Sequence, residues 1–475
     1  MLNQLTYTSD HFDLIMKICT EQIEKGVFYC DNTPVDQMRK ERGEGIESEC
    51  RSNTPAKNKE IWLKMIEGDK AYAEYCVRAK IGMQLKNKCM RDPVMYRMND
   101  TPHHRTGTKY KVYPTYDFAC PIVDSIEGVT HTLRTNEYAD RNEQFHWVQK
   151  ALGLRKVTIY DFSRLNLVNT CLSKRKLQWF VDTGRVESWQ DPRFPTLRGI
   201  LRRGIRVETL IEFMLEQGPS KNTNLMEWDK LWSINKKIID PIAPRYTAIS
   251  STQTAHLTLE NGPENCSFSV AAHPQNPKLG DKIQFRSGKI IIEGEDASPL
   301  VVGEKVTLMK WGNCTLTKIE NVEGSLKLTA TLDESDKDFK STKKLTWLSE
   351  DCDLVKVHLV EYDHLIKVKK VEEGMDFMDC LTDKSKFVTE AIAEPFVKNV
   401  QLGDIVQFER RGFFILDSRS GGGDKEQILE FVYIPDGKTK TMSTLSSKVD
   451  VKANIKGQNL ATGSQGNQEE TKASK

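Results

Sequence analysis

The fold is decided by the stretch from Tyr160 to Leu177, which reads YDFSRLNLVNTCLSKRKL. The residues that lead into it, Val157 to Tyr160, are apolar or β-branched and predict a buried strand. The stretch ends in a cationic turn, Ser173 to Lys176, where lysine supplies a mobile point charge for a polyphosphate. Because loops on a rigid sheet often carry function, the turn is a candidate phosphate site. A solvated basic loop is the alternative that these residues leave open.

Length and composition bound the class of protein. The 475 residues suffice for about three domains of roughly 150 residues each. Hydrophobic residues make up 38% and charged residues 29%, so most of the chain can bury cores. The net charge of +2 excludes a generally polycationic protein, so any nucleic-acid contact has to come from local patches. No apolar run approaches the ~18 residues that a membrane helix needs, and the sequence predicts no membrane contact.

The cysteines and histidines indicate neither a metal site nor disulfide bonds. The 11 cysteines are odd in number, widely spaced and form no C-x-x-C pair. This usage is typical of reduced thiols in a cytosolic protein. His103 and His104 are adjacent, but no cysteine or carboxylate lies at ligand spacing beside them.

Periodicity divides the chain into a mixed first half and a β-rich second half. Helices are predicted around 58–66, 142–152, 207–216 and 225–239, with helical character over the whole of 176–250. Short β-like runs alternate with turns between 76 and 112, including one at 109–112, which favours an α+β module. The order of helix, strand and loop over 142–176 is typical of the second half of a doubly wound sheet, which binds its ligand outside the carboxyl ends of its strands.

From about residue 280 to 435 many short strands with turns between them predict one or two barrels. Trp311 and Trp347 lie in this part; they could stack on unpaired bases, but a place in the barrel core is the favoured interpretation. After Pro435 the composition is too polar to bury the surface needed for order, which indicates a linker or tail. The predicted strands are Lys282 to Phe285, Lys289 to Ile292, Lys305 to Leu308, Leu345 to Leu348, Lys356 to Val360, Ile405 to Phe408 and Phe413 to Leu416.

Several blocks of sequence resemble one enzyme family. Ser163 to Asn166, followed by Leu172 to Lys176, resembles the Lys-Met-Ser-Lys-Ser signature of class I aminoacyl-tRNA synthetases, in particular the eukaryotic glutamyl and glutaminyl subgroup. Blocks at 8–12, 113–131, 191–196 and 410–414 agree, so the resemblance covers about 5–436 and is greatest to the glutamyl part of bifunctional glutamyl-prolyl enzymes. Cys171 stands where the first lysine of the signature would be, and the subgroup commonly carries an apolar residue there.

The resemblance implies ATP-dependent activation of L-glutamate and its transfer to tRNA(Glu). ATP with Mg²⁺ is then a substrate, and no tightly bound cofactor or metal is expected. Lys174, helped by Ser173, is the implied catalytic cation for the leaving pyrophosphate. The implied setting is the cytoplasm, with other synthetases of a multi-synthetase complex as further partners. The implied ATP-binding residues are Thr135, Arg164, Leu165, Leu172, Ser173 and Lys174.

Substrate choice rests on Arg134, which occupies the position where glutaminyl enzymes carry an uncharged residue. A guanidinium can bind a γ-carboxylate through two parallel hydrogen bonds, whereas a neutral side chain would suit an amide. Tyr116 matches the hydroxyl that orients the amino acid. The structural alternative for Arg134 is an ion pair with Glu137 or Asp140.

The implied fold class is multidomain. The second half of an α/β class I Rossmann-type catalytic fold, with an α+β insertion, is followed by a helical connector and then by all-β anticodon-binding barrels. The expected ranges are 1–112 for the acceptor-end binding insertion with flanking helices, 113–182 for the half Rossmann domain, 183–255 for the connector, 256–436 for the barrels and 437–475 for a disordered linker or tail.

The second class I signature, His-Ile-Gly-His, is absent from the sequence. We therefore expect the sequence to be a fragment or an incomplete gene model that activates glutamate poorly alone. Glutamate-dependent ATP–pyrophosphate exchange at a rate comparable to an intact enzyme would contradict this expectation. Two alternatives stay open: a glutaminyl-tRNA synthetase, against which Arg134 argues, and a non-catalytic tRNA-binding module, which the missing signature favours.

Overall fold

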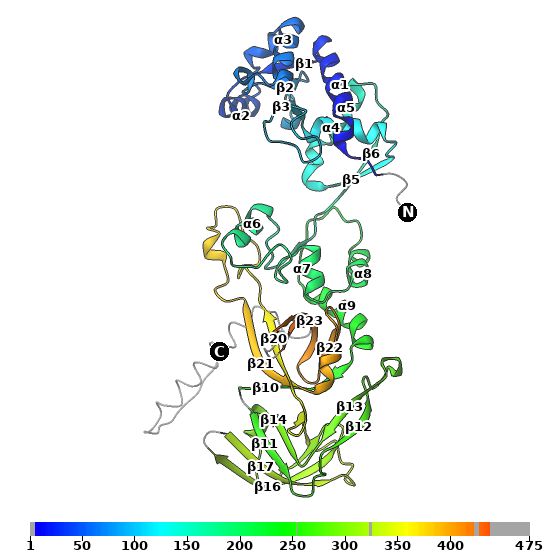
Figure 1. Ribbon diagram of the computed structural model, residues 1–475. Coiled ribbons are helices and arrows are strands. Elements are labelled where there is room, and N and C mark those ends of the chain that lie inside the picture. The colour runs from blue at the N-terminus through cyan, green and yellow to red at the C-terminus, as the bar shows by residue number, and fades with distance from the viewer. Residues whose placement is uncertain (1–4, 253, 323–324, 422–426, 438–475) are drawn as a thin grey trace, which may run out of the picture. The chain divides into compact units, whose positions relative to one another are not determined.

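A computed structural model describes residues 5–252, 254–322, 325–421 and 427–437. The chain divides into two compact units (Figure 1). Unit 1 consists of the residues up to Leu165 together with Pro219–Asn224, and unit 2 consists of Asn166–Gly218 and the residues from Leu225 onward. The predicted linker, 437–475, lies outside the described residues except for Gly437.

Unit 1 is a mixed α+β unit, as the sequence predicts for its first part. An antiparallel sheet of order β1-β2-β3-β4 is accompanied by a separate parallel pair, β5-β6. The elements are α1 (Phe12–Glu24), β1 (Phe28–Asp31), α2 (Val35–Glu44), α3 (Pro55–Glu67), β2 (Cys76–Ala79), β3 (Val94–Met98), β4 (Val112–Pro114), α4 (Tyr116–Ile126), β5 (His131–Thr135), η5 (Asn136–Arg141), α5 (Asn142–Ala151) and β6 (Thr158–Phe162).

Local signals in the sequence set the bounds of α3. The Thr54 side chain accepts a hydrogen bond from the Lys57 amide, and Pro55 occupies the first turn, where its missing N–H costs nothing. Gly68 ends the helix in the left-handed conformation, with φ +83°. Trp62 of α3 then packs edge-on against Tyr96 of β3 with ring centroids 5.1 Å apart, which ties the helix to the sheet.

Unit 2 begins with helices and continues into two β-domains. Its helical part contains β7 (Asn166–Leu167), α6 (Lys174–Asp182), α7 (Leu197–Arg202), α8 (Val207–Gln217), β8 (Leu225–Met226) and α9 (Asp229–Ile239). The rest is β9 (Arg245–Tyr246), β10 (Ala248–Ser250), β11 (Thr254–Leu259), β12 (Cys266–Ala271), β13 (Asp281–Arg286), β14 (Lys289–Glu293), α10 (Gly294–Ala297), β15 (Lys305–Leu308), β16 (Gly312–Val322), β17 (Ser325–Asp333), β18 (Lys343–Leu345), β19 (Trp347–Ser349), β20 (Val355–Tyr362), β21 (Lys386–Ala393), β22 (Ile405–Phe408), β23 (Gly412–Ser420) and β24 (Ile428–Ile434).

Two seven-stranded, barrel-like sheets (Figure 1) and a separate antiparallel pair, β12-β13, make up the β part. The first has the order β18-β15-β16-β17-β11-β14-β19, and the second has the order β10-β21-β20-β24-β23-β22-β9. Each encloses its own apolar core. Trp347 is only 4% exposed and lies in the first core, with Trp311 packed against it, so the core interpretation of these tryptophans is confirmed.

Three expectations from the sequence need correction. The range 176–250 is not wholly helical, because β8, β9 and β10 lie inside it. The run predicted at 109–112 is displaced, since β4 begins only at Val112. The single strand predicted from Leu345 to Leu348 is two strands, β18 and β19, which are interrupted at Thr346.

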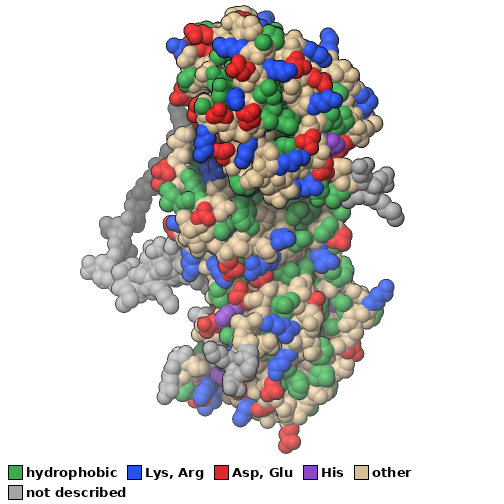
Figure 2. All heavy atoms as spheres, turned by 45° about the horizontal axis from the view of Figure 1, so that its top comes forward, with side chains coloured by type: hydrophobic (Ala, Val, Ile, Leu, Met, Phe, Trp, Pro, Cys, Tyr) green, Lys and Arg blue, Asp and Glu red, His purple; other side chains and the backbone are tan. Residues whose placement is uncertain are grey.

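The surface bears both signs of charge. Figure 2 shows lysine, arginine, aspartate and glutamate side chains interspersed over the face in view, in keeping with the net charge of +2. Among the described residues, no helix is long and apolar enough to cross a membrane.

Candidate active site

Within unit 1, a group of predicted site residues gathers at the carboxyl ends of the parallel strands β5 and β6. The strands pair in register, with Arg134 opposite Asp161 and Thr135 opposite Phe162. Thr135 is the last residue of β5, while Arg164 and Leu165 follow the end of β6. Because both strands run the same way, these residues share one edge of the sheet, which is where an open α/β sheet binds its ligand.

The side chain of Arg134 lies among aromatic rings. Its guanidinium carbon is 5.4 Å from the ring centroid of Tyr116, 5.3 Å from that of Tyr138 and 5.4 Å from that of Phe145. Arg134 is only 6% exposed, whereas Tyr116, the first residue of α4, is 51% exposed. The Arg134 guanidinium therefore lies among apolar rings, with the half-exposed side chain of Tyr116 beside it.

Hydrogen bonding around Arg134 is incomplete. Its Nε and Nη1 atoms are buried and have no hydrogen-bond partner among the described residues. Glu137 instead accepts a hydrogen bond from Nη1 of Arg164 at 3.2 Å. The predicted alternative, an ion pair of Arg134 with Glu137 or Asp140, is therefore not found in the part of the chain that the structure describes. A buried guanidinium with unused donors costs free energy unless an anion meets it.

The charge of Arg134 acts electrostatically on one carboxylate. Asp124 of α4 is half-buried and shares a hydrogen bond with Thr132 of β5. Burial raises the pKa of Asp124, and the nearby Arg134 charge opposes that rise. The neighbouring arginine, Arg141, differs from Arg134 because it donates to Asp117 at 2.9 Å.

The cationic turn belongs to unit 2, where it forms the start of α6. Ser173 is the N-cap residue, and Lys174 is the first residue of the helix. Both side chains are exposed, while Cys171 is buried just before them. The end of a helix that exposes free N–H groups favours an anion, and Lys174 adds a full positive charge there.

A distant segment, residues 365–381, holds this turn in place. The Asn169 amide donates to the Lys369 carbonyl at 2.9 Å, and Asn169 Nδ2 donates to the carbonyl of Lys367 at 3.2 Å. At the end of the turn, the ammonium of Lys176 lies 4.8 Å from the ring centroid of Phe377. Leu365 and Ile366 share one apolar core with Cys171 and Leu177. Residues 365–381 connect β20 to β21, so the second barrel positions the cationic turn.

Sequence reasoning missed Asn169 and the whole 365–381 segment. The one local signal was Asn169 itself, because its φ of +53° is a conformation in which asparagine is enriched. Nothing in a single sequence links residue 169 to residues almost two hundred positions away.

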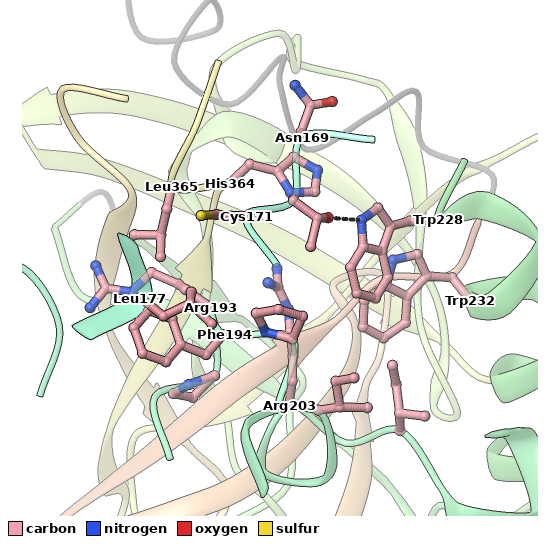
Figure 3. Close-up of a pocket in the computed structure, with 15 residues that line it drawn as sticks. Asn169, Cys171, Leu177, Arg193, Phe194, Arg203, Trp228, Trp232, His364 and Leu365 are labelled. Carbon is pink, nitrogen blue, oxygen red and sulfur yellow. Dashed lines mark hydrogen bonds between the residues drawn. The ribbon is translucent and has the colours of Figure 1, made fainter. Parts of the chain in front are cut away.

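A small cavity lies beneath the turn (Figure 3). Trp228 closes one side, and its indole N–H donates to the Val168 carbonyl and the Thr170 hydroxyl, both at 3.1 Å. Burial lowers the pKa of His364 to about 3 and that of Arg203 to about 10. The described residues include no group of three or more His, Cys, Asp or Glu side chains that could hold a metal ion.

The predicted site residues thus fall into two groups. Unit 1 brings Tyr116, Arg134, Thr135, Arg164 and Leu165 to one region, and unit 2 carries Leu172, Ser173 and Lys174 on one turn.

Three family models match this chain. The model of the catalytic domain of tRNA synthetases class I (E and Q) matches residues 2–241. Two models of the anticodon-binding domain of the same enzymes match residues 243–333 and 344–417. Most strands of the two barrel-like sheets fall in these last ranges, whereas β24 (Ile428–Ile434) lies beyond them.

Curated relatives agree with these models. The bifunctional glutamate/proline–tRNA ligase of Mus musculus is 48% identical over 461 residues, which is 95% of this chain and 30% of that protein. The cytoplasmic glutamate–tRNA ligase of Saccharomyces cerevisiae is 48% identical, covering 92% of this chain and 61% of that protein. The cytoplasmic glutamate–tRNA ligase of Arabidopsis thaliana is 47% identical with the same coverage. The chain therefore spans less than two thirds of the length of each of these relatives.

The catalytic model alone matches just over half of the chain, and the anticodon-binding models follow it in order. The fold predicted from the sequence, part of a class I catalytic domain followed by all-β barrels, is confirmed. The chain belongs to the class I (E and Q) tRNA synthetase family.

Proposed function

We propose that this chain provides the glutamate-recognition and tRNA-binding parts of a glutamate–tRNA ligase. The reaction is the ATP-dependent activation of L-glutamate, followed by its transfer to tRNA(Glu), with Mg²⁺ accompanying ATP. The single observation that carries the choice of glutamate is the buried Arg134 guanidinium with two unused donors. The names of the cytoplasmic relatives support the cytoplasm as the setting.

In this proposal Arg134 receives the side-chain carboxylate of glutamate. The desolvated surroundings strengthen the attraction between the two charges, since little water competes. A glutamine side chain cannot neutralise the guanidinium, so binding it leaves a buried charge unpaired. Tyr116, with its exposed hydroxyl-bearing side chain next to Arg134, orients the amino acid.

Lys174 and Ser173 are proposed to meet the phosphates of ATP. Negative charge builds on the leaving pyrophosphate, and a cation at the start of a helix stabilises that charge most where it develops. Leu172 belongs to the same turn, and Thr135, Arg164 and Leu165 are proposed to contact the nucleoside. The 365–381 segment, which connects β20 to β21, would hold this turn in position for the phosphates.

The two barrel-like sheets are proposed to bind the anticodon arm of tRNA(Glu), as the description of the matching models suggests. The bifunctional relative supports association with further synthetases as part of the same proposal. A glutaminyl-tRNA synthetase is the less favoured hypothesis, because the full positive charge of Arg134 suits the carboxylate of glutamate rather than the amide of glutamine.

Equilibrium binding of glutamate and glutamine to the 475-residue chain tests the proposal by calorimetry. Glutamate should bind more tightly than glutamine, and Arg134→Cys should weaken glutamate binding by about 30-fold or more, as expected when one partner of a buried charge pair is removed. Arg141→Gln is the matched control, because Arg141 lies 5.2 Å from the same Tyr138 ring but already pairs with Asp117. Equal binding of the two amino acids, or unchanged binding in Arg134→Cys, would refute the assignment.

A further inference from the structure

Helix α8 exposes two parallel rows of side chains. Val207, Ile211 and Leu215, spaced four residues apart, form an apolar row in which the exposed fractions are 52%, 56% and 77%. Glu208, Glu212 and Glu216 form an acidic row directly beside it. Side chains four residues apart lie one above another on a helix, so each row is continuous. The opposite face, with Thr209 and Phe213, is buried in unit 2.

The apolar and acidic side chains of these two rows indicate what kind of segment would bind to α8. An apolar row of this length suits a segment that carries apolar side chains of its own. The acidic row suits lysine or arginine, and it excludes a nucleic-acid backbone, whose phosphates the carboxylates repel. Glu216 already pairs with Lys230 at 2.8 Å, and Glu208 approaches Arg206 at 3.8 Å. Within the described residues Glu212 has no ion-pair partner.

The described chain ends beside α9, the helix whose Lys230 pairs with Glu216 of α8. Asp436 pairs with Lys236 of α9 at 3.4 Å. Gly437 lies against an earlier turn of α9, because a Cβ atom built there would be 2.5 Å from the Asp229 carbonyl and 2.4 Å from the Ser233 hydroxyl. Residues 436–437 therefore run along α9 from Lys236 toward its first turn. In that turn Lys230 pairs with Glu216 of the acidic row of α8.

The residues that follow have the matching composition. Five lysines stand against a single acid, Asp450, between positions 438 and 456. Apolar residues are spread among them. The lysines are Lys438, Lys440, Lys448, Lys452 and Lys456, and the apolar residues are Met442, Leu445, Val449, Val451, Ala453 and Ile455.

We propose that residues 438–456 cover the outer face of α8, with their lysines against the glutamate row and their apolar residues on the row of Val207, Ile211 and Leu215. Length allows it, since the 11 residues of α8 span about 16 Å and about five extended residues reach that far. The segment is too polar to bury a core of its own, but α8 supplies the apolar surface that it lacks. This contact is independent of the proposed ligase activity.

Carbodiimide coupling of the full chain, read by mass spectrometry, tests the contact. The reagent joins a carboxylate directly to an amine that touches it, so couplings should connect Glu208, Glu212 or Glu216 to lysines of 438–456. Replacing two residues of the apolar row, by Ile211→Ser with Leu215→Ser, should lower the yield of these couplings about tenfold or more, because the two aliphatic side chains that the contact would bury are lost. All three glutamates stay in place in that variant.

The matched control is Val301→Ser with Val302→Ser, since these two side chains are equally exposed, at 62% and 60%, elsewhere in unit 2. It should leave the yield unchanged. A mixture of ¹⁵N-labelled and unlabelled chains separates the occupants, because couplings between heavy and light peptides would mean that a second copy covers α8. That result, or lysines of 438–456 coupled without preference to carboxylates throughout the chain, overturns the proposal.

Discussion

Asp363 and His364 are neighbours in the chain, and burial moves their pKa values in opposite directions. Burial raises the pKa of Asp363 to about 6, and burial followed by the Arg203 charge lowers that of His364 to about 3. Between pH 4 and 6 the folded Asp363 holds a proton that the unfolded chain has lost, so its contribution to the free energy of unfolding falls as the pH rises. The unfolded chain holds a proton on His364 that the folded state lacks. The contribution of His364 to the free energy of unfolding therefore rises with pH.

The contributions of Asp363 and His364 to the pH dependence of the unfolding free energy have opposite signs and offset each other in the native chain. Replacing either residue alone should reveal the contribution of the other. Relative to the native chain, Asp363→Asn should gain unfolding free energy as the pH rises from 4 to 6, by up to about 1.4 kcal/mol per pH unit. His364→Asn should change with the opposite sign. Urea unfolding at several pH values measures both differences. Slopes of the same sign in the two variants would show that these residues do not titrate as assigned.

At the level of single residues, the sequence predicted a role for Arg134 but could not reveal its surroundings. Arg134, Tyr116 and Lys174 could be named as candidate site residues because each lies in a short block of sequence that resembles the family. That Nε and Nη1 of Arg134 lack partners follows from the packing of Tyr138 and Phe145, on η5 and α5, against β5. An ion pair with Glu137 was a fair expectation from spacing alone, and Arg164 took that carboxylate instead.

The cationic turn is an element whose position depends on one asparagine. Asn169→Ala removes the side-chain hydrogen bonds to the carbonyls of Ile366 and Lys367 and places alanine at a φ of +53°. We expect a loss of about 1–3 kcal/mol in the stability of this anchor and faster amide exchange over 168–176. Asn169→Gly is the matched variant, because it loses the hydrogen bonds without the backbone strain and should show a smaller effect. Equal exchange in all three proteins, read by mass spectrometry, would contradict this role for Asn169.

Elements with strong periodicity or local end signals were predictable, and those made by distant pairing were not. The helices α3, α5 and α8 and the strands β13, β14, β15 and β22 match the predicted ranges closely. Strand β9 is only Arg245–Tyr246 and exists because it pairs with Gln407 and Phe408 far along the chain. The long strand β16 escaped prediction because most of its second half is exposed, which hides the alternation. Strand β17 was missed although its leucines and Ala330 alternate with polar residues.

At the scale of the whole molecule, each unit has its own core and its own ion pair with a buried carboxylate. In unit 1 Arg78 and Asp31 pair with both side chains fully buried. In unit 2 Arg202 donates to both oxygens of Asp417, at 2.6 and 2.7 Å, and the Asp417 side chain is 4% exposed. Arg78→Met leaves the Asp31 charge buried with hydrogen bonds from Thr33 and Ser48 but no countercharge, and should cost about 3–5 kcal/mol. Asp417→Asn weakens a charged hydrogen bond worth about 1.5–3 kcal/mol.

Because domains with separate cores unfold as separate cooperative units, each substitution should lower the stability of one unit only. Hydrogen exchange with mass spectrometry along a urea series reads the two units separately. Arg78→Met should shift the urea midpoint of peptides from 5–165 and leave those from 225–437 unchanged, and Asp417→Asn should do the reverse. Arg39→Met is the control for unit 1, because its partner Asp36 is 94% exposed and such a pair contributes about 0–1 kcal/mol. A common midpoint that both substitutions shift equally would mean that the 475 residues unfold as one cooperative body, and the division at Leu165 would then have no energetic meaning.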